Sequence, residues 1–118
     1  AAWPSSEKMA KVCRQYQNNP NCFLFGFRLD EIITGCIGIR TMDNGRAEIL
    51  HISVLPEYRG TGIGSKMISD IIQSFSLHEI YAETDRDAVE FYRKIGFVAT
   101  SLGDKYPGVE RFLCERHL

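Results

Sequence analysis

The sequence predicts a mixed α/β (α+β) fold in which a central, mostly antiparallel sheet is flanked by helices. Some segments carry apolar residues at helical spacing, whereas others alternate apolar and polar residues. Along the chain these segments follow the order helix, three strands, helix, strand, helix, two strands. Short turns join the first three strands, and such connections favour antiparallel pairing.

The chain has 118 residues, which fit one domain over residues 1–118. Hydrophobic residues make up 44% and charged residues 25%, which is usual for a globular protein. The formal net charge of −1 supplies no strong field, so we expect neither nucleic acid nor membrane as a partner. No apolar run reaches a membrane-spanning length and no export signal opens the chain, so we expect a cytoplasmic location.

The cysteines form no C-x-x-C pair, and the histidines have no recognisable ligand spacing. We therefore expect no metal site. Free, mostly buried thiols in a reducing compartment are expected at Cys13, Cys22, Cys36 and Cys114. A nucleophilic cysteine or a disulfide is the alternative.

The first half of the chain predicts a helix followed by a three-stranded meander. Residues 6–17 carry apolar side chains at helical spacing, and the run Asn-Asn-Pro-Asn that follows ends the helix. Residues 22–29 and 32–40 predict a hairpin, and residues 47–55 predict the third strand. The Asn-Gly pair at 44–45 predicts the reversal before that strand.

The second half predicts two helices and three more strands. From residue 61 to 75 apolar residues recur at intervals of four and one, which indicates an amphipathic helix. Another helix is expected over residues 86–95, with Asp85 as a candidate N-cap and Gly96 as the glycine after its end. The strands are expected at residues 79–83, 97–100 and 111–115, the last two around a turn at 106–108.

The segment from Arg59 to Ser65 joins a strand to the first long helix and holds three glycines at alternate positions. Glycine lets a backbone approach a ligand closely and adopt a positive φ. The first turn of a helix leaves N–H groups unpaired at the positive end of the helix dipole. Together these features predict an anion site suited to a pyrophosphate, because a plain tight turn needs fewer glycines.

Two other phosphate loops are excluded by spacing. No Gly-Lys-Ser/Thr closes the segment, so it is not a Walker A loop. The dinucleotide fingerprint G-x-G-x-x-G would need a glycine where Ser65 stands. The preceding strand also belongs to a meander, so a nucleotide-binding domain of Rossmann type is disfavoured.

The run Arg59-Gly60-Thr61-Gly62-Ile63-Gly64 resembles the R/Q-x-x-G-x-G/A signature of the GNAT superfamily of N-acetyltransferases. The strand ahead of it and the following Pro-Glu-Tyr-Arg-Gly are also similar to that family. Residues 85–97 resemble the second hallmark of the family, N-x-x-A-x-x-F-Y-x-K-x-G-F. Two motifs in the right order are more specific than either alone, and the similarity covers roughly residues 22–115.

The resemblance implies a GNAT-like fold that uses acetyl-CoA and releases CoA. In the family the backbone of the glycine loop holds the pyrophosphate, and the strand ahead pairs with the pantetheine arm. That strand and the next are expected to splay apart. The implied cofactor-binding residues are Ile52, Ser53, Val54, Arg59, Gly60, Thr61, Gly62, Ile63, Gly64, Ser65, Asp85 and Tyr92. Asp85 stands where the family often has Asn, and its charge argues against direct contact with a phosphate.

Acetyl transfer to an amine needs one group that takes a proton and another that protonates the departing thiolate. The resemblance nominates Tyr92 as the acid, and a packed core tyrosine is the alternative. It nominates Glu48, eleven residues before Arg59, as the general base, and a solvated strand carboxylate is the alternative. On a regular strand His51 faces away from Glu48, but a bulge, common in this strand of the family, would change that.

Family members usually begin with a strand and one or two helices that help wall the acceptor pocket. This chain has about twenty residues before its first clear strand and begins Ala-Ala, so we expect a shortened N-terminal part. Either the chain is trimmed, or the acceptor site is open or completed by the second subunit of a homodimer. The predicted function is acetyl transfer from acetyl-CoA to a primary amine of a small molecule or protein, directly within a ternary complex. A non-catalytic acyl-CoA-binding sensor or interaction module is the alternative.

Overall fold

The computed structural model describes residue 14 and residues 16–118. The strands are β1 (Cys22–Leu29), β2 (Ile32–Met42), β3 (Arg46–Val54), β4 (Glu79–Asp85), β5 (Val98–Tyr106) and β6 (Val109–His117). The helices are α2 (Ile63–Ser74), α3 (Val89–Lys94) and the short 3-10 turn η1 (Pro56–Tyr58). Of the first predicted helix, Arg14, Tyr16 and Gln17 are helical, and its other residues lie outside the described part of the chain.

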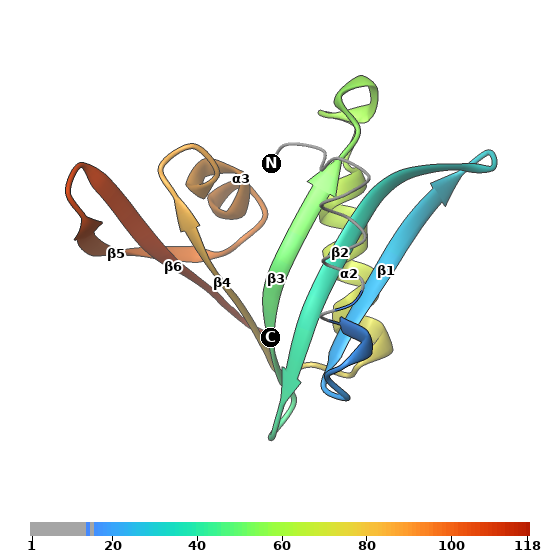
Figure 1. Cartoon of the computed structure of the whole chain (residues 1–118), viewed down its shortest axis with the longest axis horizontal. Coiled ribbons are helices and arrows are strands. Elements are labelled where there is room, and N and C mark those ends of the chain that lie inside the picture. Colours follow the sequence, from blue (N-terminus) through green and yellow to red (C-terminus); the bar gives the residue numbers. More distant parts are fainter. Residues whose placement is uncertain (1–13, 15) are drawn as a thin grey trace.

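The strands form one six-stranded sheet in the order β1-β2-β3-β4-β6-β5 (Figure 1). Every neighbouring pair is antiparallel except β3 and β4, which are parallel. This is the mixed, mostly antiparallel sheet flanked by helices that the sequence predicts.

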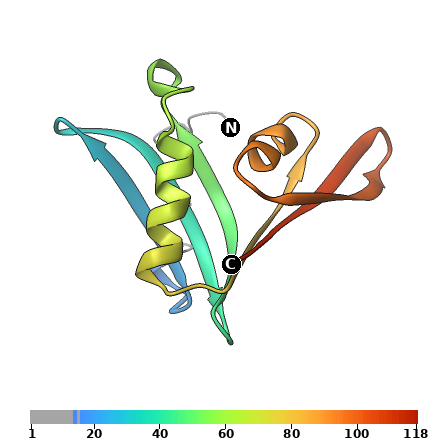
Figure 2. The same cartoon turned by 180° about the vertical axis from the view of Figure 1, so that it is seen from behind.

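Helix α2 crosses one face of β2 and β3, and the core lies between them (Figure 2). The apolar stripe of the helix buries Ile63, Met67, Ile68 and Ile71. Gly35 allows this close approach, because a Cβ there would lie 3.0 Å from Met67 Cε and 3.2 Å from Ile63 Cγ2. The position of α2 is therefore set by apolar packing on one face of the sheet.

The two halves of the sheet part between β3 and β4. Their parallel pairing is limited to Arg46 with Glu79, Ala47 with Ile80 and Glu48 with Tyr81. Beyond these pairs β3 continues beside β2, while β4 continues beside β6 (Figure 1). We call the point after Glu48 and Tyr81 the fork. The predicted splaying of these two strands is confirmed.

A bulge in β3 follows directly on the fork. Ile39 pairs with Ile49, but Gly38 pairs with His51, so Leu50 has no partner on β2. An extra residue shifts the alternation of the side chains by one step. His51 therefore lies on the same face as Glu48, which is the arrangement expected for a bulged strand and not the one expected for a regular strand.

Helix α3 is shorter than predicted and begins at Val89 instead of residue 86. Residues 86–88 form a turn, in which the Ala88 N–H donates to Asp85 Oδ1 at 3.1 Å. The carboxylate thus caps this turn rather than the helix itself. Gly96 follows the C-terminus with φ of 95°, as predicted.

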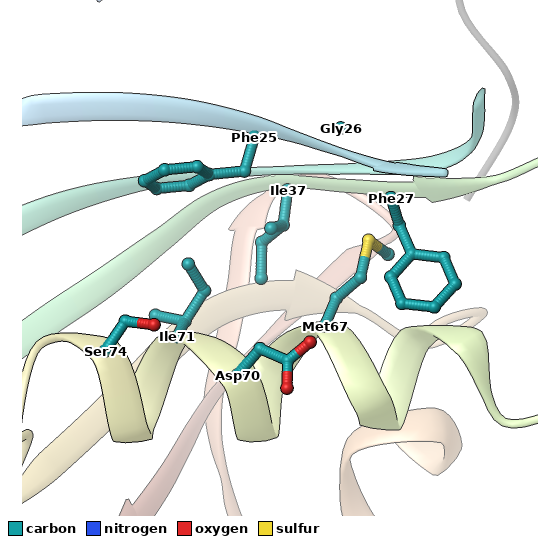
Figure 3. A pocket seen from close by; sticks show the side chains of 8 residues that line it. All are labelled: Phe25, Gly26, Phe27, Ile37, Met67, Asp70, Ile71 and Ser74. Atoms are coloured by element: carbon teal, nitrogen blue, oxygen red, sulfur yellow. The ribbon is translucent and has the colours of Figure 1, made fainter. Parts of the chain in front are cut away.

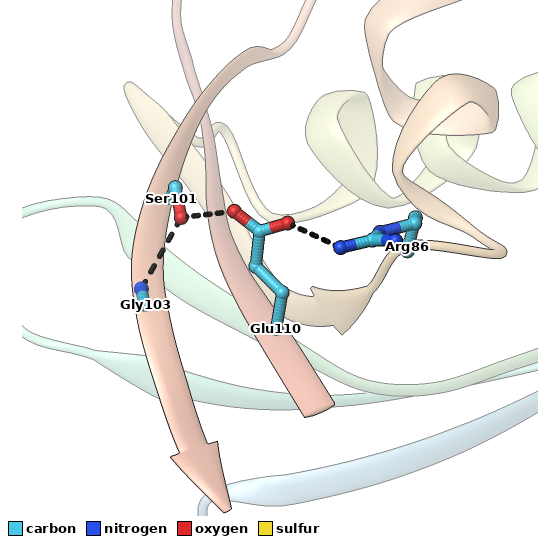
Figure 4. A network of polar contacts seen from close by, with 4 residues as sticks. All are labelled: Arg86, Ser101, Gly103 and Glu110. Atoms are coloured by element: carbon cyan, nitrogen blue, oxygen red, sulfur yellow. Dashed lines mark hydrogen bonds and ion pairs between the residues drawn. The ribbon is translucent and has the colours of Figure 1, made fainter. Parts of the chain in front are cut away.

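The β5–β6 hairpin is longer than predicted and is tied to the turn before α3 (Figure 4). Glu110 accepts from Ser101 Oγ at 2.5 Å and from Arg86 Nη2 at 3.0 Å. Ser101 Oγ accepts in turn from Gly103 N–H at 3.2 Å. These donors, the serine hydroxyl foremost, lower the pKa of Glu110. The small stabilisation is present near neutral pH and is lost as the pH falls through that lowered pKa.

A groove of about 200 Å³ lies between β1 and α2 (Figure 3). Its lining is mostly apolar and comprises Phe25, Gly26, Phe27, Ile37, Met67, Asp70, Ile71 and Ser74. The groove therefore lies along the β1 edge of the sheet, on the side of β2 away from the fork.

Three of the cysteines can be compared with the prediction. Cys22, Cys36 and Cys114 are free thiols, and the last two are buried. Cys13 lies outside the described residues. Within the described part of the chain, no helix is both long and apolar enough to cross a membrane.

Gly64 tests the packing of α2 against α3. A Cβ at Gly64 would lie 2.9 Å from both Cε1 and Cζ of Phe91. Overpacking costs about 1–3 kcal/mol, but alanine gains up to about 1 kcal/mol over glycine inside a helix, so we expect Gly64→Ala to lower the free energy of unfolding by about 1–2 kcal/mol, measured by chemical denaturation. Adding Phe91→Leu should recover most of that loss. Full stability of Gly64→Ala on its own would contradict the contact.

Candidate active site

A tight connection leads from β3 into the glycine loop. Pro56 opens η1, and its turns close through Tyr58 N–H to Leu55 O at 2.9 Å and Arg59 N–H to Pro56 O at 3.3 Å. Proline suits this first position because its φ is fixed and no N–H is needed there. The connection therefore places the loop at the end of β3, next to the start of α2.

The first two glycines of the loop are required by the backbone itself. Gly60 has φ of 76° and Gly62 has φ of 86°, both in the region that favours glycine. A Cβ at either position would meet no atom within 4 Å. The space above these two residues is thus open to a ligand, whereas Gly64 serves the packing of α3.

The start of α2 presents a set of backbone donors. Among the described residues, no N–H from Gly60 to Ser65 donates to a backbone carbonyl, and the first helical bond runs from Lys66 N–H to Gly62 O at 2.9 Å. No side chain caps the helix and no acidic residue stands in its first turn. Unpaired N–H groups at the positive end of a helix dipole suit a pyrophosphate.

The polar side chains of Arg59 and Thr61 donate hydrogen bonds to main-chain carbonyls of the protein itself. Arg59 Nε donates to Val54 O at 3.1 Å, and Thr61 Oγ1 donates to Tyr58 O. Ile63 is buried and Ser65 is half-buried. These side chains shape the loop, which agrees with the expectation that the main chain supplies the donors.

The strand residues of the predicted site lie beyond the fork. Ile52, Ser53 and Val54 follow the last residue of β3 that pairs with β4. The side chains of Ile52 and Val54 pack against the core, which holds the strand in place. Among the residues that the structure describes, no strand pairs with the edge of β3 toward β4 beyond Glu48, so this edge can pair with an extended amide-bearing ligand.

Tyr92 lies in α3 and is buried, with 4% of its surface exposed. Its ring meets those of Phe91 and Phe97 edge to face, each at 5.2 Å between centroids. Burial, and then the neighbouring Cys114 thiol, raises the pKa of Tyr92. The hydroxyl therefore stays protonated at neutral pH and can act only as a donor to an anion.

Glu48 is the last residue of β3 before the fork and is paired with a cation. Arg40 lies opposite it in the register, and Arg40 Nη2 is 2.5 Å from Glu48 Oε1. The Glu48 side chain retains 19% exposure. The carboxylate thus lies beside the fork, with one of its oxygens engaged by Arg40.

Two residues that sequence reasoning did not assign to the site lie on the same face as Glu48. Tyr16 Oη is 2.7 Å from His51 Nδ1, and burial raises the pKa of Tyr16. Gly38 makes room, since a Cβ there would lie 1.9 Å from Tyr16 Oη. A signal existed in the spacing of the branched apolar residues of β3, where Ile49 and Ile52 are three residues apart instead of two.

One group of potential metal ligands occurs in the described part of the chain. Atoms of Glu79, Glu115 and His117 lie within 4.8 Å of one another. Glu79 Oε2 is already paired with Arg46 Nε at 3.1 Å. These residues lie at the start of β4 and the end of β6, away from the glycine loop.

Comparison with known proteins decides the family. The profile described as Acetyltransferase (GNAT) family matches residues 1–97. The chain belongs to the GNAT acetyltransferase family. This confirms the family that the two motifs predict.

Individual relatives and solved structures are also similar to this chain. An uncharacterized N-acetyltransferase of Bacillus methanolicus is 32% identical over 67% of this chain and 61% of its own length. An uncharacterized protein of Mycobacterium leprae is 28% identical, and the chain, matched over 97% of its residues, spans 33% of that relative. The structure of a Bacillus anthracis protein, described as a streptothricin acetyltransferase in complex with acetyl coenzyme A, has a TM-score of 0.76 and 28% identity. The match covers 89% of this chain and 67% of the Bacillus anthracis chain.

The loop assignment is tested by Gly62→Ala. The methyl group would stand in the open space above the loop, and a left-handed conformation costs alanine about 1–2 kcal/mol. We expect acetyl-CoA affinity, measured by calorimetry, to fall at least about tenfold, equal to about 1.4 kcal/mol.

Gly103→Ala is the matched control for that variant. Gly103 also has a positive φ, 76°, and open space around its Cβ, but it lies in β5. It should lose similar stability and keep the wild-type affinity. Equal affinities for acetyl-CoA in wild type and Gly62→Ala would remove the loop from the site.

Proposed function

We propose that this chain transfers an acetyl group from acetyl-CoA to a primary amine of a small molecule or a protein, directly within a ternary complex. The proposal is carried by one observation. The edge of β3 beyond its pairing with β4 leads through the short turn η1 into the glycine loop and the N-terminus of α2. A strand edge followed by unpaired N–H groups matches a ligand that has amide groups in its arm and a pyrophosphate at its end.

The residues named from sequence keep their roles in this proposal. The backbone of Ile52, Ser53 and Val54 pairs with the pantetheine arm, and the N–H groups from Gly60 to Ser65 hold the pyrophosphate. Asp85 is given a supporting role, because its carboxylate is already engaged with the Ala88 N–H.

Tyr92 is proposed as the donor to the departing sulfur. A raised phenol pKa means that complete proton transfer to a thiolate, whose conjugate acid has a pKa near 8.5, is uphill. Tyr92 therefore lowers the barrier by donating a hydrogen bond as charge develops on the sulfur. Its aromatic neighbours hold the ring in one orientation for that purpose.

The proton of the amine needs an acceptor on the face of the sheet opposite α2. Glu48 is the residue that the family resemblance nominates, and it lies at the fork. In this role Glu48 keeps its ion pair with Arg40. We propose Glu48 as the group that accepts the proton of the amine.

Further parts of the proposal concern the setting of the reaction. We propose one GNAT-type domain acting in the cytoplasm, with the acceptor drawn from small-molecule or protein amines. A homodimer that completes the acceptor side remains part of the proposal. The Bacillus anthracis protein is described as a streptothricin acetyltransferase, so we include streptothricin among the acceptors to test.

An acyl-CoA-binding module without catalysis is the second candidate. Glu48 is paired with Arg40, and Tyr92 is packed against another aromatic ring. Each side chain therefore has a structural role without catalysis, which favours the binding module. Turnover separates the two candidates: a module binds acetyl-CoA and releases no CoA thiol with any amine.

The first test is a thermal-shift titration with acetyl-CoA, CoA, NAD and ATP, followed by thiol release across a panel of primary amines. A ligand at 100 times its Kd should stabilise the fold by about 2.7 kcal/mol. We expect a shift with acetyl-CoA and CoA only, and amine-dependent thiol release. No shift with either CoA species would contradict the proposal, and a shift without thiol release would favour the binding module.

Tyr92→Phe tests the donor. Removing only the hydroxyl keeps the aromatic packing, so we expect an intact fold and unchanged acetyl-CoA affinity. The value of kcat should fall about 100-fold, the usual size of a proton-handling contribution. Steady-state kinetics beside calorimetry measures both, and wild-type turnover would leave Tyr92 a packing residue.

A further inference from the structure

The start of β4 and the end of β6 bring together two carboxylates and an imidazole. Glu79 is paired directly with His117 across the two strands, and Glu115 stands two residues before His117 on β6. Paired residues, and residues two apart along a strand, point to the same face of a sheet. One ligand atom of each side chain lies within 4.8 Å of the other two. We call Glu79, Glu115 and His117 the β4–β6 cluster.

The backbone around the cluster is held on both strands, at the place where the two halves of the sheet join (Figure 1). Gly45 O accepts from His78 N–H at 2.7 Å and from Glu79 N–H at 3.2 Å, which ties the start of β4 to the turn between β2 and β3. Leu118 N–H donates to His78 O at 2.8 Å, which keeps the end of β6 beside β4. The position of His117 relative to Glu79 is therefore set by main-chain hydrogen bonds.

Arg46 orients the carboxylate of Glu79. Its Nε donates to Glu79 Oε2 at 3.1 Å, and its guanidinium lies over the ring of Tyr81, 4.5 Å from the centroid. In the described part of the chain no hydrogen bond reaches the other oxygen, Glu79 Oε1. Carboxylates that bind metals are themselves hydrogen-bonded by an outer residue that fixes their orientation. The ion pair with Arg46 thus leaves one oxygen of Glu79 for a ligand and holds it in place.

The cluster carries an excess of negative charge. Glu79 and Glu115 supply two negative charges, and Arg46 supplies one positive charge. No ion pair involves Glu115 within the described residues. Arg116 adds no positive charge on this face, because it alternates to the other face, where its Nε would lie 3.7 Å from a Cβ at Gly96. Two carboxylates this close repel each other, and a bound cation would turn that repulsion into attraction.

The donor atoms select the kind of cation. Mg²⁺ and Ca²⁺ take oxygen ligands, whereas a set that includes imidazole suits Zn²⁺. We propose that Glu79, Glu115 and His117 bind one Zn²⁺ ion, with water in the fourth position. His117 is exposed and both carboxylates are half-buried, so water reaches the ion. The proposal goes beyond the acetyl transfer proposed above and does not depend on it.

Binding requires only side-chain movement. With bonds of about 2.0–2.2 Å, two ligands on a tetrahedral Zn²⁺ ion lie roughly 3.4 Å apart, so the ligand atoms close in by up to roughly 1.5 Å. The strand ladder already supplies the common face and the spacing. The ion would fasten the end of β6 to the start of β4. The cluster has no motif in the sequence because Glu79 meets the other two residues only when β4 pairs with β6.

Calorimetric titration of the tag-free, chelator-treated chain with Zn²⁺ is the first test. We expect one ion per chain, and at least about a tenfold loss of affinity in His117→Ala and in Glu115→Gln, since each removes a ligand. His78→Gln is the matched control, because it removes an exposed imidazole next to Glu79 that lies outside the cluster. It should keep the wild-type affinity. Circular dichroism of each variant checks that the fold is intact.

Three results of the titration would overturn the proposal. They are no saturable binding by wild type, unchanged affinity in either cluster variant, and an equal loss of affinity in His78→Gln. Displacement of Zn²⁺ by the same concentration of Mg²⁺ or Ca²⁺ would also contradict it, because the imidazole would then have no part in the selection of the ion.

Anomalous scattering at the zinc edge from crystals grown with Zn²⁺ locates the ion directly. We expect it about 2.0–2.2 Å from a ring nitrogen of His117 and from one oxygen each of Glu79 and Glu115. The free thiol of Cys22 is half-buried and is the competing ligand to examine. An ion held there or between neighbouring molecules, with none at the cluster, would be an adventitious ion only and would overturn the proposal.

Discussion

The three-residue limit on pairing between β3 and β4 is the constraint on which the rest of the structure depends. The parallel ladder ends at Glu48 and Tyr81, although both strands continue. Two features account for the separation. The bulge at Leu50 follows at once, and a bulge increases the local twist of its strand. Meanwhile all seven residues of β4 pair with β6, which holds β4 in the other half of the sheet.

Each half of the sheet then contributes different groups to the site. The β3 half supplies the free strand edge, the glycine loop and α2, whereas the β4 half leads to α3 with Tyr92. Direct contact between the two helices is made where Phe91 packs over Gly64. Gly64, the third glycine of the loop, therefore packs the proposed phosphate site against α3, the helix that carries the proposed donor Tyr92. The three glycines share one motif but have two separate physical roles.

Local patterns in the sequence predicted most of this architecture. Alternation and turn residues located the strands, the stripe from Ile63 to Ile71 located α2, and the loop glycines located the turn that precedes α2. The start of α3 was missed because residues 86–88 form a capped turn with helical composition. Glu48 and His51 share a face because of the bulge at Leu50, which was allowed for but could not be located from the sequence.

Pairings across long separations could not be predicted in the same way. Tyr16 and His51 are 35 residues apart, and their contact depends on the absence of a side chain at Gly38 on another strand. Neither residue belongs to a motif, and the three positions meet only once β2 and β3 have paired. The ion pair of Arg40 with Glu48 arises from the same register. The side chains that meet on this face are therefore brought together by the pairing of β2 with β3.

Hydrogen exchange with and without acetyl-CoA tests the central claim, that the free edge of β3 and the glycine loop form one continuous binding surface. Amides that gain a hydrogen-bond acceptor in a bound ligand exchange more slowly. The account predicts slower exchange in residues 50–54 and 60–65 together, with little change in β5 and β6. Protection of neither segment at saturating acetyl-CoA, or of the β1–α2 groove instead, would contradict it.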